Sequence, residues 1–455
     1  MKKVIKYKSG LTLIYKRHKN SKESVYFEFK FMGGTNNDPE GMVGLAHFAE
    51  HALGLSNSKY TKGEKFELIY KKGECNFETS PNYISGYGYV ADEQFEECFC
   101  KISNWLTDID LKSDEVESER KVLVQEIKQK RINIEYALNN IIKKTMYKDF
   151  PHNNLPPFSV SGIVEHIEKI TLKDLTSYIE KTFCQKNCQL TVCGNVSLAK
   201  VKNMVSKYVL PYMPSGEKPN YKKWGEYSVY NSKTSMAKIQ SPDGENSQIY
   251  VTAICQIPAQ DNLYKHAASL LNSDFSLVAH NVFRKKYSLA YQIWAQLGVS
   301  NRLEQNKHYI VYDLNIKCDS KNVSKILQVL PEFYSEAQNC LVSDERLKQL
   351  QTNLRCKNKL SVIRSNEKLG KLLSSTYFEQ GYFDCRAELK KLKKRRKNIT
   401  VQFTNSLLTK TITQKPYIMI VSNCDDKDLP SYSQLCKQIK KNTKWAEQLN
   451  NQQNS

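Results

Sequence analysis

The sequence predicts an α+β protein with at least two domains. Strand-like and helix-like segments alternate along its 455 residues, without the glycine-rich phosphate loops of nucleotide-binding enzymes. A chain of this length exceeds one ordinary hydrophobic core. Residues 211–235 are polar and rich in proline and glycine, which predicts a linker. We therefore expect an N-terminal domain over 1–210, a linker over 211–235, a C-terminal domain over 236–425 and a polar C-terminal tail over 426–455.

The clearest strand covers residues 24–32, where apolar and polar residues alternate. One face carries Val25, Phe27, Phe29 and Phe31, and the other carries Tyr26, Glu28 and Lys30. This alternation predicts a strand that is buried on one face only. Further strands are expected at 83–90, 190–196, 249–254 and 417–421, a helix at 93–108, and a long helix from Asp114 past Ile134.

The sequence His47-Phe48-Ala49-Glu50-His51 predicts a zinc site and its catalytic base on one helical turn. Residues four apart lie on the same face of an α-helix, so two imidazoles can hold one Zn²⁺. Glu50 lies roughly 60° to the other side of His47 around the helix, where a base can take a proton from a zinc-bound water. Tetrahedral zinc needs one more protein ligand. Chance histidines on a surface helix are the alternative.

The carboxylates Glu119 and Glu126 supply candidates for that ligand. They lie seven residues apart, two helical turns, on a helix expected to begin near Ser113. Both side chains should therefore point the same way, so that one binds the metal and the other orients a histidine. Taken alone, two glutamates on a helix rich in Lys and Glu are more often a solvated face.

Taken together, these residues resemble the insulinase/pitrilysin family of zinc metallopeptidases. His47-x-x-Glu50-His51 is followed after 74 residues by Glu126, with Glu119 before it. Other matching fragments follow in family order: Gly10-Leu11-Thr12, Gly44-Leu45-Ala46, Gly162-Ile163, Asn187-x-x-Leu190, and Arg284 with Tyr291 seven residues later. Three positions depart from the family pattern, Ala49, Phe77 and Ser288, and none of them is a metal ligand.

The resemblance implies a fold, a site and an activity. Each half of the chain would be an antiparallel sheet flanked by helices, and the whole would be half of a peptidase clamshell. His47, His51 and Glu126 would bind Zn²⁺, with Glu50 as general base and Glu119 in support. Arg284 and Tyr291 would bind the substrate backbone or stabilise the oxyanion, and Asn76 and Phe77 would lie on the edge strand to which an extended peptide adds.

The resemblance also implies that the active unit is a dimer, because the family usually surrounds its peptide with four such domains. A homodimer and a heterodimer with a related subunit both remain open. The main reading is a zinc metalloendopeptidase for extended peptides. The alternative is a non-catalytic, peptide-binding scaffold subunit.

Composition limits the other function classes. The formal charge is +21, with a dense basic run at 390–397, yet no nucleic-acid motif accompanies it, so specific nucleic-acid binding is not expected. No stretch approaches the twenty apolar residues of a membrane span, and the N-terminus lacks a secretory signal. The 13 cysteines include no Cys-x-x-Cys, so we expect reduced thiols and a cytoplasmic protein.

Overall fold

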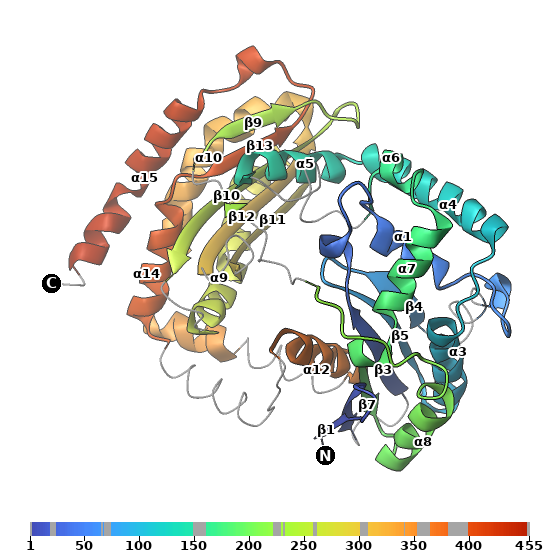
Figure 1. The fold of residues 1–455 in the computed structure, drawn as a ribbon. Coiled ribbons are helices and arrows are strands. Elements are labelled where there is room, and N and C mark those ends of the chain that lie inside the picture. Colours follow the sequence, from blue (N-terminus) through green and yellow to red (C-terminus); the bar gives the residue numbers. More distant parts are fainter. Residues whose placement is uncertain are drawn as a thin grey trace. The chain divides into compact units, whose positions relative to one another are not determined.

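The structure is a computed structural model. It describes residues 2–18, 24–64, 67, 74–148, 161–221, 229–230, 233–257, 262–300, 308–340, 342–352, 365–380 and 399–452. The chain divides into two compact units (Figure 1). Unit 1 comprises residues 1–128, 157–224 and 356–385, and unit 2 comprises residues 129–156, 225–355 and 386–455. The units therefore interleave along the chain, whereas the sequence-based division into 1–210, 211–235, 236–425 and 426–455 placed its parts in succession.

Unit 1 contains a six-stranded sheet in the order β1-β2-β7-β3-β5-β4. Strands β2 and β7 are parallel, and every other neighbouring pair is antiparallel. The strands are β1 (Lys2–Lys6), β2 (Thr12–Arg17), β3 (Ser24–Met32), β4 (Glu74–Thr79), β5 (Tyr83–Ala91) and β7 (Cys188–Gly194). Among the described strands, β4 pairs with β5 alone and therefore forms an edge of this sheet.

Unit 2 contains a five-stranded sheet in the order β11-β12-β10-β13-β9, in which only β13 and β9 are parallel. Its strands are β9 (Met236–Ile239), β10 (Asn246–Ile257), β11 (Gln292–Ser300), β12 (His308–Asp319) and β13 (Tyr417–Val421). This order repeats β4-β5-β3-β7-β2 of unit 1, with the parallel pair at the same place. The prediction of two similar domains, each a mainly antiparallel sheet flanked by helices, is confirmed. A separate two-stranded ladder joins β6 (Tyr147–Lys148) and β8 (Val229–Tyr230).

The helices of unit 1 enclose its main core. They are α1 (Leu45–Ala52), α3 (Phe95–Thr107), α4 (Ser113–Arg131), α6 (Val164–Ile167), α7 (Leu172–Thr182), α8 (Leu198–Tyr208) and α12 (Asn366–Gln380). Phe27, Phe29 and Phe31 of β3 pack in one cluster with residues of α1, α3, α4, α7 and α8. The apolar face of β3, which the alternation predicted, therefore belongs to the same core as the buried residues of α1.

Both faces of β3 are buried, whereas the sequence predicted one solvent-exposed face. Helix α12, from the second half of the chain, packs across β3 and β7 (Figure 1). Tyr26, Glu28 and Lys30 on this face are all buried, and the last two form an ion pair at 3.1 Å. Gly370 gives the close approach that this needs, because a Cβ there would lie 2.1 Å from the Tyr26 ring. The periodicity of β3 cannot show that a helix about 340 residues later in the sequence covers its second face.

The helices of unit 2 are α5 (Ile134–Met146), α9 (Asn262–His280), α10 (Val323–Ala337), α14 (Val401–Ile412) and α15 (Tyr432–Gln452). The expected long helix from Asp114 is instead two helices, α4 and α5. Asn133 separates them, since its side chain accepts a hydrogen bond from Glu135 N at 2.8 Å and begins α5. The expected polar tail 426–455 contains α15, which places Leu435 and Ile439 in the core of unit 2.

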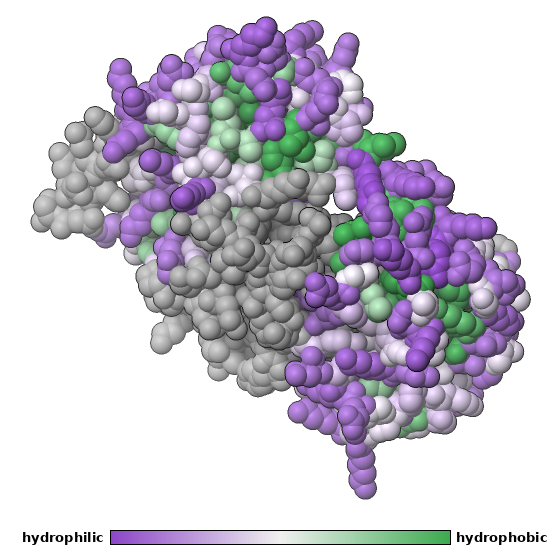
Figure 2. Space-filling view, turned by 45° about the horizontal axis from the view of Figure 1, so that its top comes forward, coloured by the Kyte–Doolittle hydropathy of each residue, from purple (hydrophilic) through white to green (hydrophobic). Residues whose placement is uncertain are grey.

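The face of the molecule in Figure 2 is mainly polar where it is coloured. Purple, hydrophilic residues cover most of the coloured part of the face in Figure 2, and green patches between them are small. Among the described residues, no helix combines the length and the apolar composition that crossing a membrane requires. The basic run at 390–397 lies outside the described residues.

Candidate metal centre and active site

Helix α1 presents both histidines and Glu50 to one place. The helix begins at a left-handed residue, Gly44, whose φ is 103°. Asp38 satisfies the open N-terminus, because its carboxylate accepts hydrogen bonds from Gly44 N at 2.7 Å and Ala46 N at 2.9 Å. The rings of His47 and His51 stand edge to face, with centroids 4.8 Å apart. The i,i+4 spacing therefore produces the predicted pair.

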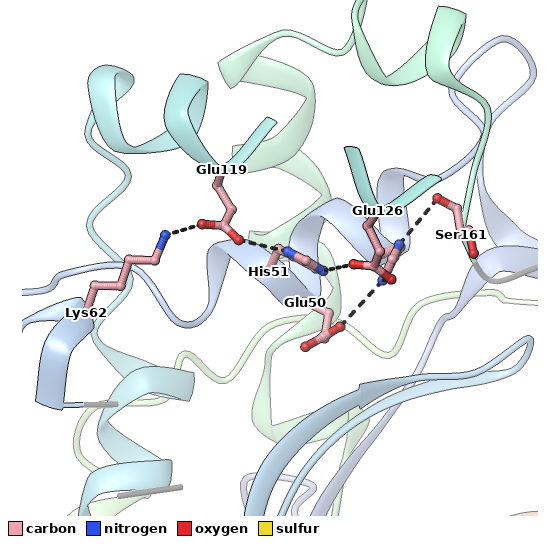
Figure 3. A network of polar contacts seen from close by, with 7 residues as sticks. Glu50, His51, Lys62, Glu119, Glu126 and Ser161 are labelled. Carbon is pink, nitrogen blue, oxygen red and sulfur yellow. Dashed lines mark hydrogen bonds and ion pairs between the residues drawn. The ribbon is translucent and has the colours of Figure 1, made fainter. Parts of the chain in front are cut away.

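Helix α4 places Glu126 against that pair (Figure 3). The Glu126 carboxylate oxygens lie 3.4 Å from His51 Nε2 and 3.9 Å from His47 Nε2. Ligand atoms of these three residues all lie within 4.8 Å of one another. Of the residues that the structure describes, these three form the one group of histidine, cysteine or acidic residues with the spacing of a metal site.

The second nitrogen of each ring is held by an acceptor. His51 Nδ1 lies 2.9 Å from Glu119 Oε1, and His47 Nδ1 lies 3.3 Å from the carbonyl oxygen of Ser161. An acceptor at Nδ1 holds the proton there and leaves Nε2 to face a metal. Glu119 was predicted in this supporting place. Ser161 was not, and the only signal for it is its neighbour Gly162 in the family fragment.

Glu50 lies beside the group formed by His47, His51 and Glu126. Its Oε2 is 4.0 Å from His47 Nε2, and the side chain is mostly buried. Glu50 thus stands next to the ligand atoms without being among them. A carboxylate in that position can accept a proton from a water held at the site.

The electrostatics of the site favour positive charge. Burial opposes the charged form of His51, but hydrogen bonds to Glu119 and Glu126 and the nearby charge of Glu50 raise its pKa to about 9. Burial also opposes the charged form of Glu119, but hydrogen bonds with His51 and Lys62 lower its pKa to about 2. The protein therefore holds a proton on His51 where a metal ion would provide the positive charge.

The donor set fits zinc. Two imidazole nitrogens and one carboxylate oxygen are the protein ligands of many catalytic zinc sites, in which a water takes the fourth position. The acceptors at both Nδ1 atoms are the partners that zinc-binding histidines usually have. The residues present therefore suit the metal that the sequence implied.

Asn76 and Phe77 lie on the edge strand β4, as the sequence predicted. The exposed Asn76 side chain accepts a hydrogen bond from Phe77 N at 2.9 Å. The Phe77 side chain points the other way, is only 4% exposed and belongs to the core. The glycine opposite it, Gly86, leaves the room, because a Cβ there would lie 2.7 Å from the Phe77 ring. Any contact of Phe77 with an added peptide strand must therefore come from its backbone.

Arg284 and Tyr291 belong to unit 2, on either side of the turn into β11. Arg284 lies in a π-helical segment, Asn281–Lys286, and its Nη1 donates to the carbonyl oxygen of Tyr291 at 3.2 Å. Tyr291 is 49% exposed, and its hydroxyl lies 3.5 Å from Asn246 Oδ1. The structure brings the predicted pair together, and neither side chain is part of a core.

Family models and curated relatives agree on one group of proteins. The model described as Insulinase (Peptidase family M16) matches residues 13–155, and that described as Peptidase M16 inactive domain matches residues 169–354. The zinc protease PqqE of Helicobacter pylori is 24% identical over 204 residues, 44% of this chain and 45% of that protein. The beta subunit of mitochondrial-processing peptidase from Caenorhabditis elegans is 24% identical over 176 residues, 38% of this chain and 38% of that subunit. This chain thus matches less than half the length of each of these two relatives.

Solved structures show the same fold over nearly the whole chain. A protease from Helicobacter pylori has a TM-score of 0.74 at 16% identity and covers 93% of this chain and 99% of its own. The first half of the periplasmic protease PqqL from Escherichia coli has a TM-score of 0.74 at 14% identity, with 97% of this chain and 96% of its own covered. Both family models, together with this fold, show that the chain belongs to the insulinase family of peptidases, family M16.

Proposed function

We propose that this chain is a zinc-dependent endopeptidase that cleaves extended or unstructured peptides. The observation that carries the proposal is the convergence of His47, His51 and Glu126, with Glu50 beside them and an acceptor behind each ring. Relatives named as zinc proteases, from Helicobacter pylori and Mycobacterium leprae, support the same metal and reaction class.

His47, His51 and Glu126 would hold the metal, which when bound would polarise a carbonyl and make a water a stronger acid. Glu50 would accept the proton of the attacking water and pass it to the leaving amine. Glu119 would keep the His51 ring in place. Arg284 and Tyr291 would bind the peptide backbone, and β4 near Asn76 would pair with it as an added strand.

The proposed active unit contains two chains of this type. The structural match with the whole periplasmic protease PqqL from Escherichia coli includes 97% of this chain but only 50% of PqqL. PqqL is therefore about twice as long as this chain. Either a homodimer or a heterodimer with a related subunit would supply two such chains. The name of the mitochondrial-processing peptidase beta subunit, a relative, supports the heterodimer. We also propose a cytoplasmic location, supported only by the cysteine pattern of the sequence.

One experiment tests the peptidase. Zinc content and hydrolysis of a mixed pool of peptides are measured for the native chain, for Glu50→Gln and for Glu180→Gln. Glu180 is an exposed residue of α7 and serves as the matched control. We expect about one zinc per chain in all three and a loss of hydrolysis of about a hundredfold or more in Glu50→Gln alone. If the zinc-loaded native chain cleaves nothing that Glu50→Gln leaves intact, the non-catalytic scaffold reading replaces this one.

A further inference from the structure

Lys62 reaches the metal centre through Glu119. Its Nζ contacts Glu119 Oε2, while Oε1 of the same carboxylate lies 2.9 Å from His51 Nδ1 (Figure 3). The Glu119 side chain is 8% exposed, so both of its oxygens find their partners inside the protein. Lys62, Glu119 and His51 therefore form one chain of polar contacts that ends at a metal ligand.

The orientation of the Glu119 carboxylate depends on both contacts. A carboxylate turns easily about its last bond, because that torsion is broad. A partner on Oε2 restricts the turn and keeps Oε1 directed at the ring of His51. A charged partner suits this task, because hydrogen bonds between charged groups are shorter and stronger than neutral ones.

The segment that carries Lys62 is itself fixed to helix α4. Ser56 N donates to Glu115 Oε2 at 3.0 Å, one helical turn before Glu119. The Ser56 hydroxyl in turn accepts from Lys62 N at 3.3 Å. The backbone of Lys62 is thus connected to helix α4, which carries Glu119, and its side chain, 37% exposed, needs only to reach across to that carboxylate.

The charges of the site support the same role. The carboxylates of Glu50, Glu119 and Glu126 and the ammonium of Lys62 together carry a formal charge of −2, which one divalent cation neutralises. Without Lys62, Glu119 Oε2 would keep its buried position and lose its charged partner, which is unfavourable.

We propose that Lys62 is a positioning residue of the metal centre, which orients Glu119 so that Glu119 in turn orients His51 for zinc. This inference deepens the proposed function and rests on the binding of zinc in that proposal. It does not require that any peptide be cleaved.

Zinc affinity, measured by competition with a chelator, tests the role of Lys62 directly. We expect Lys62→Met to weaken zinc binding by about tenfold, the lower end of the range found when the hydrogen-bond partner of a metal-binding histidine is lost, because Lys62 acts through that partner. Lys62→Arg should restore most of the affinity, because it keeps the charge and the donors. Lys59→Met is the matched control, since Lys59 is an exposed lysine three residues earlier, stacked on the Tyr212 ring.

A double-mutant cycle decides whether Lys62 acts through Glu119. In a Glu119→Gln background, Lys62→Met should weaken zinc binding by less than about twofold, since the residue it positions is already altered. Additive losses, or a native affinity in Lys62→Met, would overturn this role for Lys62. A native chain that binds no zinc would instead overturn the proposed function, so the two failures are distinguishable.

Discussion

Glu119 Oε1 lies 2.9 Å from His51 Nδ1, while Glu126 Oε2 lies 3.4 Å from Nε2 of the same ring. Both carboxylates come from helix α4, two turns apart, and so the imidazole of His51 is enclosed from both sides by a single helix. This arrangement has consequences for the dependence of stability on pH and for the release of a proton when zinc binds.

In the zinc-free protein, the pair makes stability depend on pH. Glu119 has a folded pKa of about 2, below its ordinary 4.5, so its contribution is full above pH 4.5 and is lost as the pH falls toward 2. His51 has a folded pKa of about 9, above its ordinary 6.5, so its contribution is full below pH 6.5 and is lost as the pH rises through 9. We expect Glu119→Gln to lower the free energy of unfolding by about 2 kcal/mol at about pH 5.5 and by clearly less at about pH 9.5. Denaturant unfolding measures both values, and equal losses at the two pH values contradict the assignment.

Zinc binding should displace a proton from His51. At neutral pH the ring is protonated on both nitrogens, because its pKa is about 9, and a metal ligand must be neutral. We expect about one proton to be released per zinc at about pH 7.5, and the apparent affinity to rise with pH up to about 9. Calorimetry in buffers of different ionisation enthalpy counts the protons. A heat of binding that is independent of the buffer contradicts the prediction.

The parts of the site that lie on one helix could be read from the sequence. The His47–His51 pair and the Glu119–Glu126 pair follow from helical periodicity, and β3 has the bounds that its alternation gave. Lys62 and Ser161 could not be read, because each reaches its partner through tertiary packing. A single lysine and a backbone carbonyl carry no sequence pattern that distinguishes them from others.

The assignment of α5 to unit 2 and of α12 to unit 1 escaped prediction for a related reason. Local patterns show that a segment is helical and which face is apolar, but they do not show which sheet it covers. Helix α5, from the first half of the sequence, packs on β13 of unit 2, which comes from the second half. Helix α12, from the second half, packs on β7 of unit 1, which comes from the first half. The polar stripe of β3 was therefore assigned to solvent, although α12 covers this side of the sheet: Asn366 donates to the carbonyl oxygen of Ser24 in β3, and Gln189 of β7 donates to that of Ser374.

Gly162 should be needed for the support of His47. Its φ is +91°, and a Cβ there would lie 2.8 Å from the Cα of Gly44, where α1 begins. We expect Gly162→Ala to lower stability by more than the 1–2 kcal/mol or so of a left-handed residue and to weaken zinc binding, since Ser161 must move. Gly41→Ala is the control, with φ +77° and no atom within 4 Å of an added Cβ. Thermal unfolding and chelator competition measure both variants. Equal behaviour of the two would show that the contact of Gly162 with Gly44 is unimportant.

Phe77 should matter for stability more than for the choice of peptide. Its side chain fills the core opposite Gly86, and so Phe77→Ala should lower the free energy of unfolding by about 3–5 kcal/mol. Asn76→Ala, on the exposed face of the same strand, should change stability by less than about 0.5 kcal/mol and raise KM for peptides. Denaturant unfolding and steady-state kinetics measure the two effects. A stable Phe77→Ala with altered cleavage sites would reassign Phe77 to the substrate channel.

Tyr291 and Arg284 offer the sharpest test of substrate binding outside unit 1. Because Tyr291 is 49% exposed, Tyr291→Phe should leave the free energy of unfolding within about 0.5 kcal/mol of the native value. If its hydroxyl binds the peptide, kcat/KM should fall by about tenfold, as expected for one lost hydrogen bond of about 1.4 kcal/mol. Tyr212→Phe, an equally exposed tyrosine of unit 1 at 55%, controls for the loss of a hydroxyl from the surface. Arg284→Ala should lower kcat/KM further, because it removes a charged donor and also releases the carbonyl of Tyr291. Native kinetics in both variants would mean that the Arg284 contact to the Tyr291 backbone serves only to close the turn into β11.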